Sequence, residues 1–186
     1  MEIFKGIEDC GGEEMKKYEQ EIIEKYAHGR ICDLGCGCGR CFPMLKEKGS
    51  YIGIDIRKEQ IKEARKTYDP FFKVGDAMDM QFEDDTFDTI FCGFNVLDEV
   101  ADLNKVLSEI RRTLKNKGTL IFSFHNSLNW KNFLRSRYTS WNSKRKVNIM
   151  TPFKIKKYLE DKGFKYLERY GSIFGPYPYY IFRVRK

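Results

Sequence analysis

A glycine-rich turn directly after a short apolar run is the strongest chemical signal in this chain. Residues 31–40 read ICDLGCGCGR, and Asp33 stands two positions before the first of three alternating glycines, Gly35, Gly37 and Gly39. A strand that turns into a helix through glycines brings backbone N–H groups and a helix N-terminus close to a ligand. The stretch therefore predicts a nucleotide-cofactor site at the carboxyl edge of a parallel sheet.

A second acidic residue stands where such a site needs one. Asp55 ends the apolar run 51–54, 20 positions after Gly35. At this offset an acid in nucleotide-binding folds reaches the ribose, although an ordinary acid at a strand end is the alternative. Two ribose hydroxyls that donate to one carboxylate form charge-assisted hydrogen bonds worth roughly 1.5–3 kcal/mol each. We expect Ile56 to lie against the face of the base.

The spacing of the glycines separates the classes of nucleotide. A dinucleotide site of the G-x-G-x-x-G type requires a glycine where Arg40 stands, and no Gly-Lys-Ser/Thr follows as a P-loop requires. The remaining pattern, D-L-G-x-G-x-G, resembles the first motif of the class I S-adenosylmethionine-dependent methyltransferases. For the glycines alone, a tight turn without a ligand is the alternative.

Three later stretches resemble further motifs of that family, in its methyltransferase type 11-like branch. Residues 75–78 (GDAM) resemble an adenine-binding motif, and residues 81–88 (QFEDDTFD) resemble P-F-x-D-x-S-F-D with Gln81 in place of proline. Residues 114–120 (LKNKGTL) resemble L-K-P-G-G-x-L, with Asn116 in place of proline. Four motifs in the same order, between residues 31 and 124, are far more specific than any one of them.

The resemblance implies that S-adenosylmethionine is the cofactor and indicates which residues bind it. Asp76 would accept a hydrogen bond from the adenine amino group, the Ala77 N–H would serve a ring nitrogen, and Met78 would pack on the ring. Phe94 would lie beside the methionine end of the cofactor. The full expected set is Asp33, Gly35, Cys36, Gly37, Asp55, Ile56, Asp76, Ala77, Met78 and Phe94.

Two residues at expected strand ends are candidates for catalysis. His125 titrates near neutrality and is placed to act as a general base if the acceptor must lose a proton. A structural role, in which His125 caps a backbone group, is the alternative. Asn95 is a candidate to orient the acceptor. Val96-Leu97 follow it instead of the P-P-[YF] typical of adenine and exocyclic-amine methyltransferases, which argues against such acceptors.

The periodicity of apolar residues predicts the elements that position these residues. With the resemblance, it predicts a doubly wound α/β fold: a seven-stranded, mostly parallel sheet with an antiparallel C-terminal hairpin and helices on both faces. The 186 residues are expected to form a single domain, with residues 1–29 as an N-terminal helical cap and 126–150 as an insertion over the active-site mouth. Expected strands are 30–34, 51–55, 71–74, 89–92, 119–124, 164–170 and 179–184, and expected helices are 13–27, 40–48, 58–67, 103–114 and 153–162.

Six cysteines suggest either disulfides or a metal site. Four of them crowd around the glycine turn, where most pairings would distort it, and nothing near Met1 resembles an export signal. Cys36, Cys38 and Cys41 form C-x-C-x-x-C, a spacing that can hold zinc or iron–sulfur but is not the radical-SAM spacing. We expect reduced thiols, no metal, a cytoplasmic location and no membrane span, because no apolar run approaches the ~20 residues that a spanning helix needs.

The formal charge of +7 is distributed unevenly. Residues 131–186 hold 15 Lys and Arg against 3 Asp and Glu, a balance of +12, whereas the remainder holds 19 against 24, a balance of −5. The basic C-terminal part suggests an anionic partner such as a phosphate group, RNA or a lipid surface, with a solvated basic face as the alternative. The sequence therefore predicts methyl transfer to a small or medium-sized acceptor that can be anionic. The alternatives are an RNA (tRNA-type) methyltransferase and a non-catalytic S-adenosylmethionine-binding partner subunit.

Overall fold

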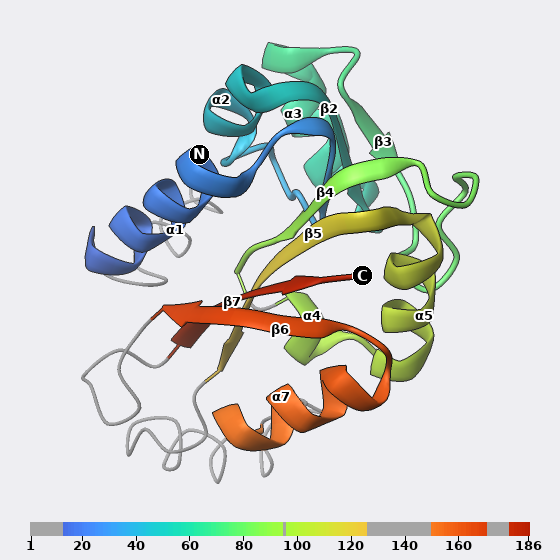
Figure 1. Ribbon diagram of the computed structural model, residues 1–186. Coiled ribbons are helices and arrows are strands. Elements are labelled where there is room, and N and C mark those ends of the chain that lie inside the picture. Colours follow the sequence, from blue (N-terminus) through green and yellow to red (C-terminus); the bar gives the residue numbers. More distant parts are fainter. Residues whose placement is uncertain (1–12, 95, 126–149, 171–178) are drawn as a thin grey trace, which may run out of the picture.

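A seven-stranded sheet forms the centre of the computed structural model, which describes residues 13–94, 96–125, 150–170 and 179–186 (Figure 1). The strands run in the order β3-β2-β1-β4-β5-β7-β6. β1 pairs in parallel with β2 and β4, and β7 runs antiparallel to both β5 and β6. The predicted doubly wound sheet with an antiparallel C-terminal hairpin is confirmed. The strands are β1 Gly29–Leu34, β2 Gly49–Asp55, β3 Phe72–Val74, β4 Phe87–Cys92, β5 Leu114–His125, β6 Lys165–Tyr170 and β7 Tyr179–Arg185.

Helices cover both faces of this sheet and bury two separate apolar clusters. One cluster lies under α1, α2 and α3, and the other under α4, α5 and α7. Successive strand residues alternate between the clusters, as the pleat requires: Ile31 packs into the first and Cys32 into the second. The helices are α1 Glu13–Tyr26, α2 Phe42–Leu45, the 3-10 turn η1 Lys46–Lys48, α3 Lys58–Tyr68, α4 Val96–Glu99, α5 Leu103–Thr113 and α7 Pro152–Asp161.

Local capping residues set the starts of two of these helices. The Asp102 carboxylate accepts a hydrogen bond from the Lys105 N–H at 3.1 Å and begins α5. The Thr151 hydroxyl accepts one from the Lys154 N–H at 3.2 Å and begins α7, with Pro152 in the first turn. Side-chain caps of this kind satisfy backbone N–H groups that have no partner inside the helix. Within the described ranges, no helix is long and apolar enough to cross a membrane.

Two predicted boundaries were wrong for reasons of backbone geometry. The expected helix 40–48 is only a short α2 followed by η1, because the N–H groups of Gly39 and Phe42 bond back into the glycine loop and delay its start. The strand expected over residues 119–124 begins earlier, at Leu114, and contains an irregularity. There Lys117 has a φ of +67°, and the pairing with β4 changes register between Leu114 and Thr119.

Candidate cofactor site

The predicted site residues gather at the carboxyl ends of the central parallel strands. β1 lies between β2 and β4, so the strand order reverses at this point of the sheet. The chain leaves β1 into the glycine loop, residues 35–39, and leaves β2 at Asp55. In open α/β sheets, the crevice at such a switch point is where ligands bind.

Packing requires the glycines in the loop that follows β1. Gly35 has a φ of +76°, and a Cβ there would come within 2.5 Å of the Val96 side chain. Gly39 has a φ of +88°, and a Cβ there would come within 2.7 Å of the Phe72 ring. The N–H groups of Gly35 and its successor both donate to the Ile54 carbonyl, at 2.8 and 3.1 Å. The loop therefore packs against β2, and these two N–H groups already have a hydrogen-bond partner within the protein.

Asp55 is the best-defined acidic group of the site. Its carboxylate is only 4% exposed and accepts the Gly37 N–H at 2.9 Å, which ties the glycine loop to the end of β2. The Arg57 guanidinium donates to both carboxylate oxygens, at 2.9 and 3.0 Å. Burial opposes ionisation, but the hydrogen bonds from the Arg57 side chain and backbone outweigh it and hold the pKa of Asp55 below its usual value. Asp55 is therefore a buried carboxylate that stays charged at neutral pH.

The residues expected at the adenine follow the carboxyl ends of the neighbouring strands β2 and β3. Ile56 follows Asp55 and is 61% exposed, which is unusual for isoleucine. Asp76, Ala77 and Met78 are half-buried at the end of β3. One Asp76 oxygen accepts the Met78 N–H at 2.8 Å, and the other has no partner among the described residues. An exposed apolar side chain and an available acceptor thus share this edge of the sheet.

Asp33 is buried within the sheet and behaves differently from Asp55. It is 3% exposed, and the Tyr51 hydroxyl donates to it at 2.9 Å. Burial raises the pKa of Asp33 to about 7, although the Tyr51 hydrogen bond and the charge of Arg40 oppose this rise. Of the two strand-end acids, only Asp55 is charged throughout the neutral range.

Arg40 and Glu19 form an ion pair that sequence reasoning missed. The guanidinium lies 2.9 Å from the Glu19 carboxylate and stacks 3.7 Å above the Phe94 ring. Its Nε and one Nη atom are buried without an aligned hydrogen bond, so the pair is close in distance but poorly oriented. Phe94 has a φ of +50°, a strained backbone conformation that is enriched at functional sites. Arg40 had a signal, since it follows the glycine triplet, but nothing local marks Glu19.

The remaining predicted residues separate into buried groups and groups outside the described part. Cys36 is buried, and burial raises the pKa of its thiol, so it packs as an apolar side chain. The described thiols of the chain are free, and no cluster of His, Cys, Asp and Glu in these ranges is arranged to hold a metal ion. Asn95 and the side chain of His125 lie outside the described residues; only the backbone of His125, at the end of β5, is placed.

Comparison with known proteins identifies the family. A model of the methyltransferase domain matches residues 25–166. A demethylmenaquinone methyltransferase of Thermotoga maritima is 34% identical over 110 residues, covering 57% of this chain and 48% of the relative. A phosphatidylethanolamine N-methyltransferase of Cereibacter sphaeroides is 27% identical over 104 residues, covering 52% and 51%. The chain spans about half the length of the curated relatives it matches.

Solved structures share the fold at low sequence identity. A chain in the complex between the Haloferax volcanii Trm112 methyltransferase activator and a methyltransferase superposes with a TM-score of 0.79 and 18% identity, covering 97% of this chain and 92% of that one. An S-adenosylmethionine-dependent methyltransferase of Mesorhizobium loti superposes with a TM-score of 0.74 and 17% identity, covering 91% and 96%. The matched domain, the strand order and the glycine loop all indicate the same family. The chain belongs to the family of class I S-adenosylmethionine-dependent methyltransferases, and membership implies S-adenosylmethionine as the methyl donor.

Proposed function

We propose that this chain transfers the methyl group of S-adenosylmethionine to a small or medium-sized anionic acceptor, and that Asp55 binds the ribose of the donor. The observation that carries the site is the Asp55 carboxylate, which is buried, charged and adjacent to the glycine loop. A charged carboxylate in such surroundings is a strong acceptor for two hydroxyl groups. The exposed Ile56 beside it offers an apolar surface to the base.

Arg40, Glu19 and Phe94 form a cluster that can bind the methionine end of the donor. Buried guanidinium nitrogens without an aligned acceptor fit a carboxylate, because a buried unpaired donor is costly until it is satisfied. Glu19 is 7% exposed and provides negative charge for an ammonium group. We assign the amino-acid tail of the donor to this cluster.

The chain's own contribution to the chemistry is alignment. S-adenosylmethionine supplies a methyl group on a sulfonium, which is already a strong electrophile. Orientation of the acceptor and exclusion of water can lower the barrier by several kcal/mol, with an upper range of about 7–11 kcal/mol. We propose His125 as the general base, where the acceptor carries a proton, and Asn95 as the residue that orients it. His125 is the last residue of β5, and Asn95 comes three residues after the end of β4 in the sequence.

Binding of S-adenosylhomocysteine, measured by calorimetry, tests the assignment of the donor site. The wild type should bind with micromolar affinity, and Asp55→Ala should weaken binding at least tenfold because two charge-assisted hydrogen bonds are lost. Glu59→Ala is the matched control, since Glu59 is an exposed acid in the first turn of α3 and should not matter. Absence of binding to the wild type would reject the proposal.

A screen of acceptors with labelled methyl donor tests the reaction. Labelled product from an anionic metabolite is the expected result. Cofactor binding without transfer to any metabolite or RNA would favour a non-catalytic, cofactor-binding subunit instead.

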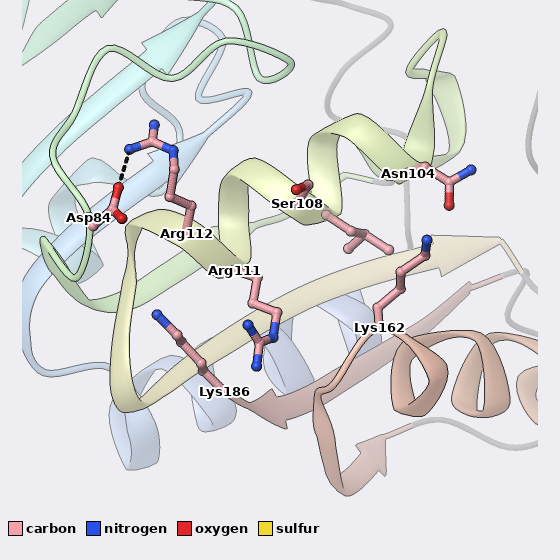
Figure 2. Close-up of a pocket in the computed structure, with 8 residues that line it drawn as sticks. Asp84, Asn104, Ser108, Arg111, Arg112, Lys162 and Lys186 are labelled. Atoms are coloured by element: carbon pink, nitrogen blue, oxygen red, sulfur yellow. Dashed lines mark hydrogen bonds and ion pairs between the residues drawn. The ribbon is translucent and has the colours of Figure 1, made fainter.

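A basic pocket favours RNA as a second candidate acceptor. The pocket has a volume of about 470 Å³ and lies under α5, where Arg111, Lys162 and Lys186 project from three separate segments (Figure 2). Arg112 and Asp84 also line the pocket and neutralise each other as an ion pair at 2.8 Å, and Lys186 pairs with Asp85 (Figure 2). Arg111 and Lys162 have no acidic partner within the described residues. The pocket lies near the amino ends of β4 and β5, so a small acceptor at the carboxyl edge cannot reach it, whereas a polynucleotide can span both.

Charge reversal in this pocket separates the two candidates. If RNA is the acceptor, the double variant Arg111→Glu/Lys162→Glu should weaken RNA binding and flatten its dependence on salt. Lys66→Glu, on the other face of the sheet in α3, is the control and should leave the slope unchanged. Negligible RNA binding by the wild type at low salt would remove this candidate and leave the small anionic acceptor.

A further inference from the structure

The Asp55 carboxylate already accepts four hydrogen bonds from its own chain. Oδ1 accepts the Arg57 backbone N–H at 2.9 Å and the Arg57 Nε–H at 3.0 Å. Oδ2 accepts the Gly37 N–H at 2.9 Å and an Arg57 Nη–H at 2.9 Å. An ionised carboxylate offers about four lone-pair sites, so every acceptor position of Asp55 is in use.

Two of these four hydrogen bonds are far easier to exchange than the others. The N–H groups of Gly37 and Arg57 belong to backbone held by the glycine loop and by the start of α3, where the Arg57 carbonyl accepts the Gln60 N–H. The Arg57 side chain is 62% exposed and carries its guanidinium on a flexible stem. It contributes two N–H groups, the same number as the hydroxyl groups of a ribose diol.

We propose that the Arg57 guanidinium competes with the ribose of the cofactor for Asp55, so that Arg57 sets the affinity of the methyl-donor site. This inference rests on the proposed role of Asp55. On binding, two hydroxyl donors replace two guanidinium donors, while the backbone hydrogen bonds from Gly37 and Arg57 remain. The carboxylate of Asp55 keeps the same number of hydrogen bonds but loses its ion pair with Arg57. Arg57 therefore lowers cofactor affinity.

The displaced guanidinium does not have to leave the neighbourhood. A Cβ on Gly37 would lie 3.6 Å from the Arg57 Nη and 3.8 Å from the Gln60 Oε1, so both side chains pass over the glycine loop. The charge of Glu99 also acts on Arg57. An acceptor amide and a negative charge therefore remain within its surroundings.

Removal of the Arg57 side chain breaks no hydrogen bond within α3, so it tests the competition directly. Arg57 is the N-cap residue of α3, but its side chain makes no capping hydrogen bond to the helix. Alanine at this position therefore removes the competitor and no helix contact. Arg57→Gln is a second variant that keeps side-chain donors but removes the charge.

Calorimetry with two ligands isolates the competition. The ligands are S-adenosylhomocysteine and its analogue without the 2′ and 3′ hydroxyls, and Arg65→Ala is the control arginine of the same helix. Because an ion pair with an exposed arginine is weak, Arg57→Ala should bind S-adenosylhomocysteine roughly two- to fivefold more tightly than the wild type. The affinity of Arg57→Gln for S-adenosylhomocysteine should fall between those of the wild type and Arg57→Ala, and Arg65→Ala should match the wild type. The analogue without hydroxyls should bind no variant more tightly than it binds the wild type.

The possible failures are distinguishable. If the wild type binds S-adenosylhomocysteine but Arg57→Ala binds it equally or more weakly, Arg57 supports the site and the inference is overturned. An equal gain for the ligand without hydroxyls would also overturn it, because the diol would then not be the competing group. If the wild type binds neither ligand, the proposed function fails and this inference fails with it.

Discussion

Replacement of Asp33 by asparagine should change how stability depends on pH. Burial raises the pKa of Asp33 in the folded chain to about 7, against an ordinary value of 3.8. The folded state therefore holds this proton more tightly than the unfolded state. By linkage, the free energy of unfolding falls as pH rises from about 4 to about 7 and is level, for this group, above that range.

The size of the effect follows from the displacement of the pKa. At 1.36 kcal/mol per pKa unit, the change from 3.8 to about 7 corresponds to about 4 kcal/mol. Asparagine has nearly the same shape, keeps a carbonyl oxygen for the Tyr51 hydroxyl and cannot ionise. Asp33→Asn should therefore lie within about 1 kcal/mol of the wild type near pH 4.5 and exceed its stability by up to about 4 kcal/mol at pH 8.

Urea unfolding at a series of pH values between 4.5 and 8.5 measures this difference. Asp88→Asn is the control whose difference from the wild type should stay constant over this range, because hydrogen bonds from Arg30 and Lys115 lower the pKa of Asp88 despite its partial burial. The contribution of Asp88 is present above pH 4 and is lost as pH falls through its lowered pKa. A stability difference between Asp33→Asn and the wild type that stays constant across the range would refute the reasoning and show that Arg40 keeps Asp33 ionised.

Three further substitutions test catalysis and packing. His125→Ala should lower kcat by about 10²–10⁴-fold while leaving the Kd of S-adenosylhomocysteine unchanged; equal kcat values would remove the general-base role. Arg112→Ala should destabilise the chain by about 2–3 kcal/mol in urea, because its guanidinium bonds Glu109, an aspartate and two backbone carbonyls. Arg111→Ala, one position earlier and without such bonds, should stay within about 0.5 kcal/mol, and similar losses for both would contradict this account. Gly35→Ala should cost about 2 kcal/mol or more, since it combines a positive φ with a 2.5 Å approach, and an unchanged midpoint of thermal unfolding would count against it.

The resemblance and the local patterns predicted the fold closely because its signals are short-range. Apolar runs indicated the seven strands, and α7 begins at Pro152, one residue before the predicted start of the helix 153–162. The glycine triplet and the interval to Asp55 indicated where β1 and β2 would present a site. Each of these signals lies within about 20 residues of sequence, where backbone geometry alone decides the outcome.

The state of each site residue depended on distant partners and could not be predicted in this way. The spacing shows two similar acids near the ends of two strands. Burial raises the pKa of Asp33, whereas hydrogen bonds from Arg57 lower the pKa of Asp55. The ion pair of Glu19 and Arg40 joins a helix to the loop after β1, and no local pattern marks it.

The sequence by itself determined the class of fold, the order of its elements and the positions of the glycines and acids, because these depend on periodicity and turn geometry. Only the tertiary structure decided which carboxylate is charged and which cations are neutralised. Desolvation and side-chain hydrogen bonds arise from packing between segments far apart in the chain, and their balance is absent from any single stretch of it.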